Sequence, residues 1–252
     1  MGAVILTANG FFKNSHLVAD IDCGKALALV FEIAQHIARM HEVRDEYLKD
    51  QHAAASKFDP RIRKDRSVIL PTVYNAQARC KDFLQKSDHV LRELLELVKL
   101  FYGDAKGAWT GLQAKVEAAP KPDNFAEFLA SQLPFIMTIR NGRNAAEHPN
   151  SSMKIEVQDF GVDTSNNLRP PTIRVIHPKT PLDATPIEQF MVHVSERIVG
   201  IVELLIVFLC ARHTREAGGF PIHVMELPEA HRRRGVRYGY GMLINGQFVP
   251  MS

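Results

Sequence analysis

A polar run near the middle of the chain carries groups that could catalyse the cleavage of RNA. Residues 139–150 read Ile-Arg-Asn-Gly-Arg-Asn-Ala-Ala-Glu-His-Pro-Asn, and they include two guanidinium groups, amides and one imidazole. RNA carries its own nucleophile, the 2′-hydroxyl, and an imidazole whose pKa lies near neutrality can accept that proton as a general base. A guanidinium can bind two phosphoryl oxygens and stabilise the negative charge that they gather in the transition state. This chemistry requires no metal ion.

The spacing of these residues predicts a role for each. In a helix, Arg140, Asn144 and His148 are four residues apart and share one face, with Arg143 on the neighbouring strip. We expect His148 to be the general base, Arg143 to stabilise the transition state and Asn144 to orient both. Arg140 would assist phosphate binding. The structural alternative is an exposed ion pair between Arg143 and Glu147, a solvated amide at position 144 and an imidazole that caps the helix.

Residues 143–148, Arg-Asn-Ala-Ala-Glu-His, resemble the motif of the HEPN superfamily (higher eukaryotes and prokaryotes nucleotide-binding). In that family an Arg, commonly followed by a polar residue, is separated from a His by four to six intervening residues, and this chain has the shortest spacing. The resemblance implies an all-helical fold over about residues 20–215 and a metal-independent endoribonuclease that leaves a 2′,3′-cyclic phosphate and a 5′-hydroxyl. It also implies a homodimer in which two motifs face each other across a cleft.

The same resemblance suggests a biological setting and an alternative. Many of these nucleases are toxins of toxin–antitoxin or phage-defence systems, so an antitoxin protein is a possible partner. In some of them a Tyr two residues after the His is adenylylated, but here that position is Asn150, so this form of regulation is not expected. The alternative is a non-catalytic module of the same family that binds RNA, a nucleotide or a protein partner.

Hydrophobic periodicity predicts the elements that position the motif. Apolar residues recur at three- and four-residue steps over about residues 23–55, 67–102, 124–148 and 185–213, with a shorter helix over 109–118. Asn124 is expected to cap the third long helix, and His148-Pro149 should end it, because the residue before proline disfavours the helical conformation. Thr185-Pro186-Ile187-Glu188 has the pattern of a capping box that starts the fourth.

Two segments alternate apolar and polar residues as strands do. Residues 153–178 predict a β-hairpin inserted between helices, and residues 218–252 predict a C-terminal hairpin that turns at Asn245-Gly246. The expected fold is therefore mainly α: a bundle of four long helices with a short extra helix and two small β-hairpin appendages. We expect residues 1–252 to form a single domain.

Positive charge is concentrated in two clusters that could bind RNA phosphates, although the net charge of the 252 residues is only +3. The first cluster spans residues 57–66, and the second holds Arg232, Arg233, Arg234 and Arg237. Tyr238 and Tyr240 follow the second cluster and could stack on unpaired bases. The structural alternative is that both clusters are solvated loop charges.

Cysteine usage and hydropathy indicate the compartment. Cys23, Cys80 and Cys210 lie in apolar helical patterns and form no Cys-x-x-Cys pair, so we expect buried free thiols. No metal-binding or cofactor-binding motif is present, and none is expected to be needed. The longest apolar run, residues 198–210, is too short to cross a bilayer, and the first residues lack the charge of a signal peptide. These features predict a cytoplasmic protein with no membrane partner.

Overall fold

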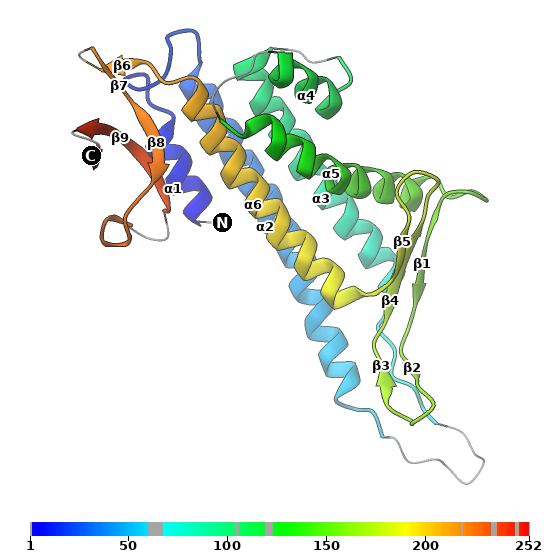
Figure 1. Cartoon of the computed structure of the whole chain (residues 1–252). Coiled ribbons are helices and arrows are strands. Elements are labelled where there is room, and N and C mark those ends of the chain that lie inside the picture. The colour runs from blue at the N-terminus through cyan, green and yellow to red at the C-terminus, as the bar shows by residue number, and fades with distance from the viewer. Residues whose placement is uncertain are drawn as a thin grey trace. The chain divides into compact units, whose positions relative to one another are not determined.

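The computed structural model describes residues 2–59, 68–103, 106–118, 123–217, 219–232, 236–244 and 247–251 (Figure 1). Its helices are α1 (Gly2–Phe11), α2 (Cys23–Ala55), α3 (Ala76–Tyr102), α4 (Trp109–Ala118), α5 (Phe125–Glu147) and α6 (Ile187–Arg212), with a 3-10 helix η1 (Glu229–His231). Its strands are β1 (Lys154–Gln158), β2 (Gly161–Val162), β3 (Leu168–Arg169), β4 (Thr172–Ile176), β5 (Leu182–Pro186), β6 (Glu216–Ala217), β7 (Phe220–Pro221), β8 (His223–Glu226), β9 (Tyr238–Ile244) and β10 (Gln247–Pro250).

The chain divides into two compact units, and α2, α3, α5 and α6 each contribute residues to both. Unit 1 comprises Met1–Ile37, Val90–Leu133 and Arg197–Ser252. Unit 2 comprises Ala38–His89 and Pro134–Glu196. The end of α5, which carries the polar motif, therefore belongs to unit 2 together with strands β1–β5.

Unit 2 combines helix ends with an antiparallel sheet whose strand order is β1-β4-β5. Ile155 pairs with Val175 across β1 and β4, and both side chains are buried. A side chain at Gly142 of α5 would place its Cβ 3.3 Å from Leu84 of α3 and 3.8 Å from Val175 of β4. The packing of α5 on α3 and on the sheet therefore leaves little room for a larger side chain at position 142.

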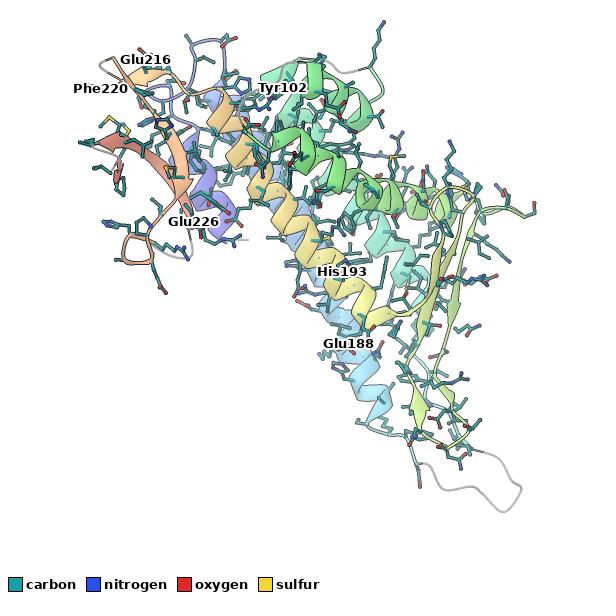
Figure 2. All side chains as sticks on the ribbon, viewed as in Figure 1. Tyr102, Glu188, His193, Glu216, Phe220 and Glu226 are labelled. Atoms are coloured by element: carbon teal, nitrogen blue, oxygen red, sulfur yellow. The ribbon has the colours of Figure 1, made fainter. Side chains whose placement is uncertain are left out.

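Unit 1 packs helix α1 against a second antiparallel sheet whose order is β10-β9-β8. Phe11 and Tyr240 meet edge to face with ring centroids 5.0 Å apart, and the Tyr240 hydroxyl donates a hydrogen bond to the Phe11 carbonyl at 3.0 Å. Figure 1 shows α1 beside β8 and β9. The short strands β6 and β7 form a hairpin, on which Phe220 is exposed (Figure 2).

The prediction of a mainly α bundle with two small hairpins is wrong. The described residues contain ten strands in two three-stranded and two two-stranded sheets, which makes the fold a mixture of helices and sheets. The helical fold that the family resemblance implied fails with it. The sequence pattern missed α1 altogether, and it extended α3 back to residue 67, although the helix begins at Ala76.

The start of α6 shows why one strand was missed. Residues 185–188 were predicted to cap the helix, but Thr185 and Pro186 belong to β5, and the Thr185 hydroxyl donates to the Asp183 carbonyl at 2.9 Å. Glu188, in the first turn of α6 (Figure 2), accepts a hydrogen bond from Gln51 Nε2 at 3.1 Å instead of turning back to the helix start. Pairing of β5 with β4 thus outweighs the local capping pattern.

Several predictions are confirmed. Helices occur at α2, α4 and α5 close to the expected limits, and the three cysteines are buried free thiols. Burial raises the pKa of the Cys80 thiol to about 12 and also raises the pKa of Cys210. Among the helices in the described part of the chain, none combines the length and apolar character that a bilayer crossing requires.

Candidate functional site

The polar motif lies at the C-terminal end of α5, where one side of the helix is fixed in the core of unit 2. Ile139 and Ala145 are buried, and the buried Asn141 donates a hydrogen bond to the Thr180 hydroxyl at 3.1 Å. The helix ends at Glu147 as predicted, and the backbone N–H of His148 still donates to the Asn144 carbonyl at 2.9 Å. These contacts fix the rotation of α5 and thereby the direction of its polar side.

Arg143 is the centre of the cluster, and three side chains surround its guanidinium. Nη1 donates to Oδ1 of Asn144 at 2.9 Å. Nε lies 2.9 Å from Oε2 of Glu147 and 3.8 Å from Oδ2 of Asp88, which comes from α3. The Arg143 side chain is 20% exposed, whereas that of Asp88 is 5% exposed. A carboxylate from a neighbouring helix thus holds the arginine from its buried side.

Glu147 links the arginine to the imidazole. It accepts a hydrogen bond from Gln85 Nε2 at 2.7 Å, and this bond is the main reason that its pKa lies below the usual value, with Arg143 and His148 adding to the effect. Nε2 of His148 lies 4.0 Å from the same Oε2 atom that contacts Arg143. The guanidinium and the imidazole therefore converge on one carboxylate oxygen, and the His148 side chain is 75% exposed to solvent.

The structure brings together some predicted site residues and separates others. Arg143, Asn144 and His148 form one cluster, whereas Arg140 is exposed one turn earlier on α5. The ion pair of the structural alternative is also present. It is not exposed, however, because the Arg143 and Glu147 side chains are only 20% and 18% accessible.

The sequence analysis missed two partners, Gln85 and Asp88, which both lie on α3. A signal for Asp88 does exist, because it continues an apolar series at helical spacing with Leu84 and Leu91, both buried. A carboxylate at such a position needs a polar or charged partner in the fold. Only the packing of α5 on α3 reveals that this partner includes Arg143.

The predicted RNA-binding residues of unit 1 have mixed outcomes. Arg232 is exposed, donating to the Leu227 carbonyl at 2.9 Å and to Glu226 at 2.7 Å. Arg233 and Arg234 lie outside the described residues, as do positions 60–66 of the first basic cluster. Tyr240 is 5% exposed and stacks on His16, so the expectation that its ring stacks on an unpaired base is wrong.

The cluster on α5 and α3 is suited to acid–base chemistry on an anionic substrate. An accessible imidazole stands near a guanidinium, and one oxygen of an ionised carboxylate lies 2.9 Å from the guanidinium and 4.0 Å from the imidazole. Among the described residues, no group of three or more His, Cys, Asp and Glu side chains is placed to bind a metal ion. Comparisons of the chain with protein-family models, with the curated proteins and with the solved structures found no match.

Proposed function

We propose that the protein is a metal-independent endoribonuclease whose active site is the cluster around Arg143. The observation that carries the proposal is the convergence of Arg143 Nε and His148 Nε2 on one oxygen of Glu147, at 2.9 and 4.0 Å. When a general base and a guanidinium lie this close to a common atom, the base can reach the 2′-hydroxyl of a ribose while the guanidinium contacts the adjacent phosphate.

The reaction uses the 2′-hydroxyl of the substrate as the nucleophile. His148 removes the proton from that hydroxyl while its oxygen forms a bond to phosphorus and the bond from phosphorus to the 5′-oxygen breaks. The imidazolium then returns a proton to the departing 5′-oxygen. The products are a 2′,3′-cyclic phosphate and a 5′-hydroxyl, so no water molecule is consumed.

In this proposal, the guanidinium of Arg143 contacts the phosphate of the substrate. Its Nε lies 2.9 Å from Glu147 and its Nη1 donates to Asn144, so the proposal assigns the phosphate to Nη2. A phosphoryl oxygen can accept from Nη2 as negative charge develops in the transition state. Asn144 would orient the guanidinium plane through its hydrogen bond with Nη1. Arg140, exposed on the same helix, extends the positive field toward the substrate.

The resemblance of residues 143–148 to the HEPN motif supports a proposal for the biological role of this activity. On that basis we place the protein among the toxins of toxin–antitoxin or phage-defence systems, acting in the cytoplasm as a homodimer. An antitoxin protein would restrain it. Expression of the chain in a bacterial host would then arrest growth, and His148→Ala would relieve the arrest.

One observation favours a second candidate, a non-catalytic module that binds RNA, a nucleotide or a protein partner. The charge of Arg143 is already balanced by Glu147 and Asp88, as in many structural ion pairs. Such a module would bind its partner without cleaving RNA, and His148→Ala would leave binding unchanged.

The deciding experiment is the incubation of the purified chain with a labelled single-stranded RNA in excess EDTA. We expect cleavage, products with 2′,3′-cyclic phosphate ends, and no cleavage of the same RNA after 2′-O-methylation. His52→Ala is a matched control, because His52 is an exposed histidine of unit 2 that pairs with Glu188 away from the motif. Absence of cleavage, or equal cleavage by His148→Ala and His52→Ala, would refute the nuclease.

A further inference from the structure

A cavity of about 420 Å³ lies within unit 1, between α1 and the C-terminal sheet. Its walls come from α1 and the residues after it, from η1 and from strands β9 and β10. The volume falls in the range of pockets that bind small molecules. None of the residues proposed for RNA cleavage lines this cavity.

Aromatic rings form one wall of the cavity. His16 and Tyr240 stack with ring centroids 4.7 Å apart and planes 8° from parallel, and Phe11 packs edge-on against Tyr240. Hydrogen bonds hold these rings in place, because Ser15 contacts His16 Nδ1 at 2.9 Å and Tyr240 donates to a main-chain carbonyl. Tyr238 adds a fourth ring to the lining. Rigid aromatic walls favour a planar, apolar ligand body.

The charge of the lining is positive. Lys13 lines the cavity, and no lining residue in the described chain is Asp or Glu. Burial, followed by the charges of Lys13 and Arg215, lowers the pKa of His16, so positive potential acts on this wall. Arg215 is fixed there by its hydrogen bond to the Ser15 carbonyl at 2.8 Å. An anionic group on a ligand would find Lys13 in this wall and Arg215 close to it, with no Asp or Glu among the described lining residues.

Two lining residues, Thr7 and Gly10, add a polar group without a partner and unfilled space to the cavity. Thr7 lines the cavity and is 1% exposed, yet its hydroxyl has no hydrogen-bond partner among the described residues. Gly10 also lines it, and a Cβ added there would meet no atom within 4 Å. A buried hydroxyl without a partner is costly, and a ligand oxygen would satisfy it.

We propose that this cavity binds a small planar aromatic anion, such as an aromatic carboxylate, with its ring beside Tyr238 and its charge toward Lys13. The site is separate from the proposed RNA-cleaving cluster and does not depend on it. It makes the C-terminal sheet a ligand-binding element of the protein.

The test uses the full chain and the fluorescent aromatic sulfonate 8-anilinonaphthalene-1-sulfonate as the probe. The wild-type chain should bind it saturably at one site with enhanced emission. Gly10→Leu fills the cavity and should weaken binding by about 10-fold or more, because a side chain would occupy the ligand volume. Gly200→Leu is the matched control: its Cβ also meets no atom within 4 Å, but Gly200 lies on α6 outside the cavity.

Charge and shape are tested separately. Lys13→Gln should weaken probe binding about five-fold at low salt, and the difference should shrink as salt screens the charge. Competition by 1-naphthoate should exceed competition by the neutral 1-naphthalenemethanol, and acetate should not compete. Thermal unfolding of each variant confirms that it is folded. Equal probe binding by Gly10→Leu and Gly200→Leu, or equal competition by the acid and the alcohol, would overturn the proposal.

Discussion

Two arginine–carboxylate contacts, one in each unit, differ in how completely the guanidinium is used. In unit 1, Arg212 donates from Nε and Nη2 to the two oxygens of Asp123, each at 2.7 Å, and lies over the Phe125 ring at 5.1 Å. Its side chain is 3% exposed. In unit 2, Arg143 is 20% exposed and divides its contacts among Asn144, Glu147 and Asp88 at distances from 2.9 to 3.8 Å.

This difference in contacts indicates a structural role for Arg212. It also indicates that Arg143 can exchange a protein contact for a substrate phosphate. A bidentate pair uses the planar fork of arginine fully, so a phosphate would have to displace a well-matched carboxylate. The contacts of Arg143 are divided among three side chains and are longer, so each is individually weaker, and an accessible imidazole lies nearby. Partial use of a guanidinium beside a titratable group is therefore the feature that distinguishes the candidate active site.

The largest expected effect follows from removing the proposed base. His148→Ala should reduce RNA cleavage by about 10²–10⁴-fold, the usual contribution of general base catalysis. Because the side chain is 75% exposed, thermal unfolding should change little. The rate is measured with saturating RNA in EDTA, beside His52→Ala as the control. If the His148→Ala chain cleaves RNA at the wild-type rate, His148 is not the general base. The Arg143 cluster would then have a structural role, as Arg212 has.

Substitution of Arg143 tests the guanidinium itself. Arg143→Ala should lower the cleavage rate by about 10²–10³-fold, because charge on the phosphoryl oxygens loses its stabilising donor. Arg143→Lys should recover only a small part of the rate, since an ammonium lacks the fork that contacts Asn144 and Glu147 together. Full activity of the lysine variant would show that only the charge is needed.

Substitution of Arg212 should change the stability of the fold. Arg212→Ala should lower the free energy of unfolding by about 3 kcal/mol, because it leaves Asp123 without its bidentate partner. Arg143→Ala should cost less, since its contacts are longer and more solvated. Urea unfolding monitored by circular dichroism measures both. A larger loss for Arg143→Ala would reverse the assignment of the two sites.

The smallest effect concerns the titration of Glu147. Its pKa in the folded chain lies below the ordinary value of 4.5, so the ionised form stabilises the fold above that pH, and this contribution is lost as pH falls through the folded pKa. Glu147→Gln should therefore flatten the decline of stability below pH 4.5. Thermal unfolding of both chains from neutral to acidic pH provides the measurement. Parallel pH profiles would indicate that the carboxylate is not held by Gln85 and Arg143.

Local pattern was enough to predict some elements and not others. The helix that carries the motif was predictable, because an apolar series runs along α5 and a proline follows His148. Strand β5 was not, because its last residues also match a helix start, and only pairing with β4 decides between them. Helix α1 was missed because the apolar residues of its sequence form a run without the three- and four-residue spacing of an amphipathic helix.

Some residues of the candidate site could be predicted from the sequence, and others could not. The types and spacing of Arg143, Asn144 and His148 were enough to nominate them, since all three lie within two turns of one helix. Gln85 and Asp88 lie more than fifty residues away along the chain, so only tertiary packing brings them to the arginine. The unit 1 cavity depends on contacts between the two ends of the chain, which periodicity cannot reveal.

The buried thiols make the chain easy to label at a chosen position. Because burial keeps the pKa of Cys23, Cys80 and Cys210 above the usual range, little thiolate forms and maleimides should leave the native sulfurs untouched. Arg140→Cys would then supply one reactive sulfur on the exposed side of α5. Bifunctional crosslinkers of graded length attached there would report whether two copies bring their motifs face to face, with no native cysteine to remove first.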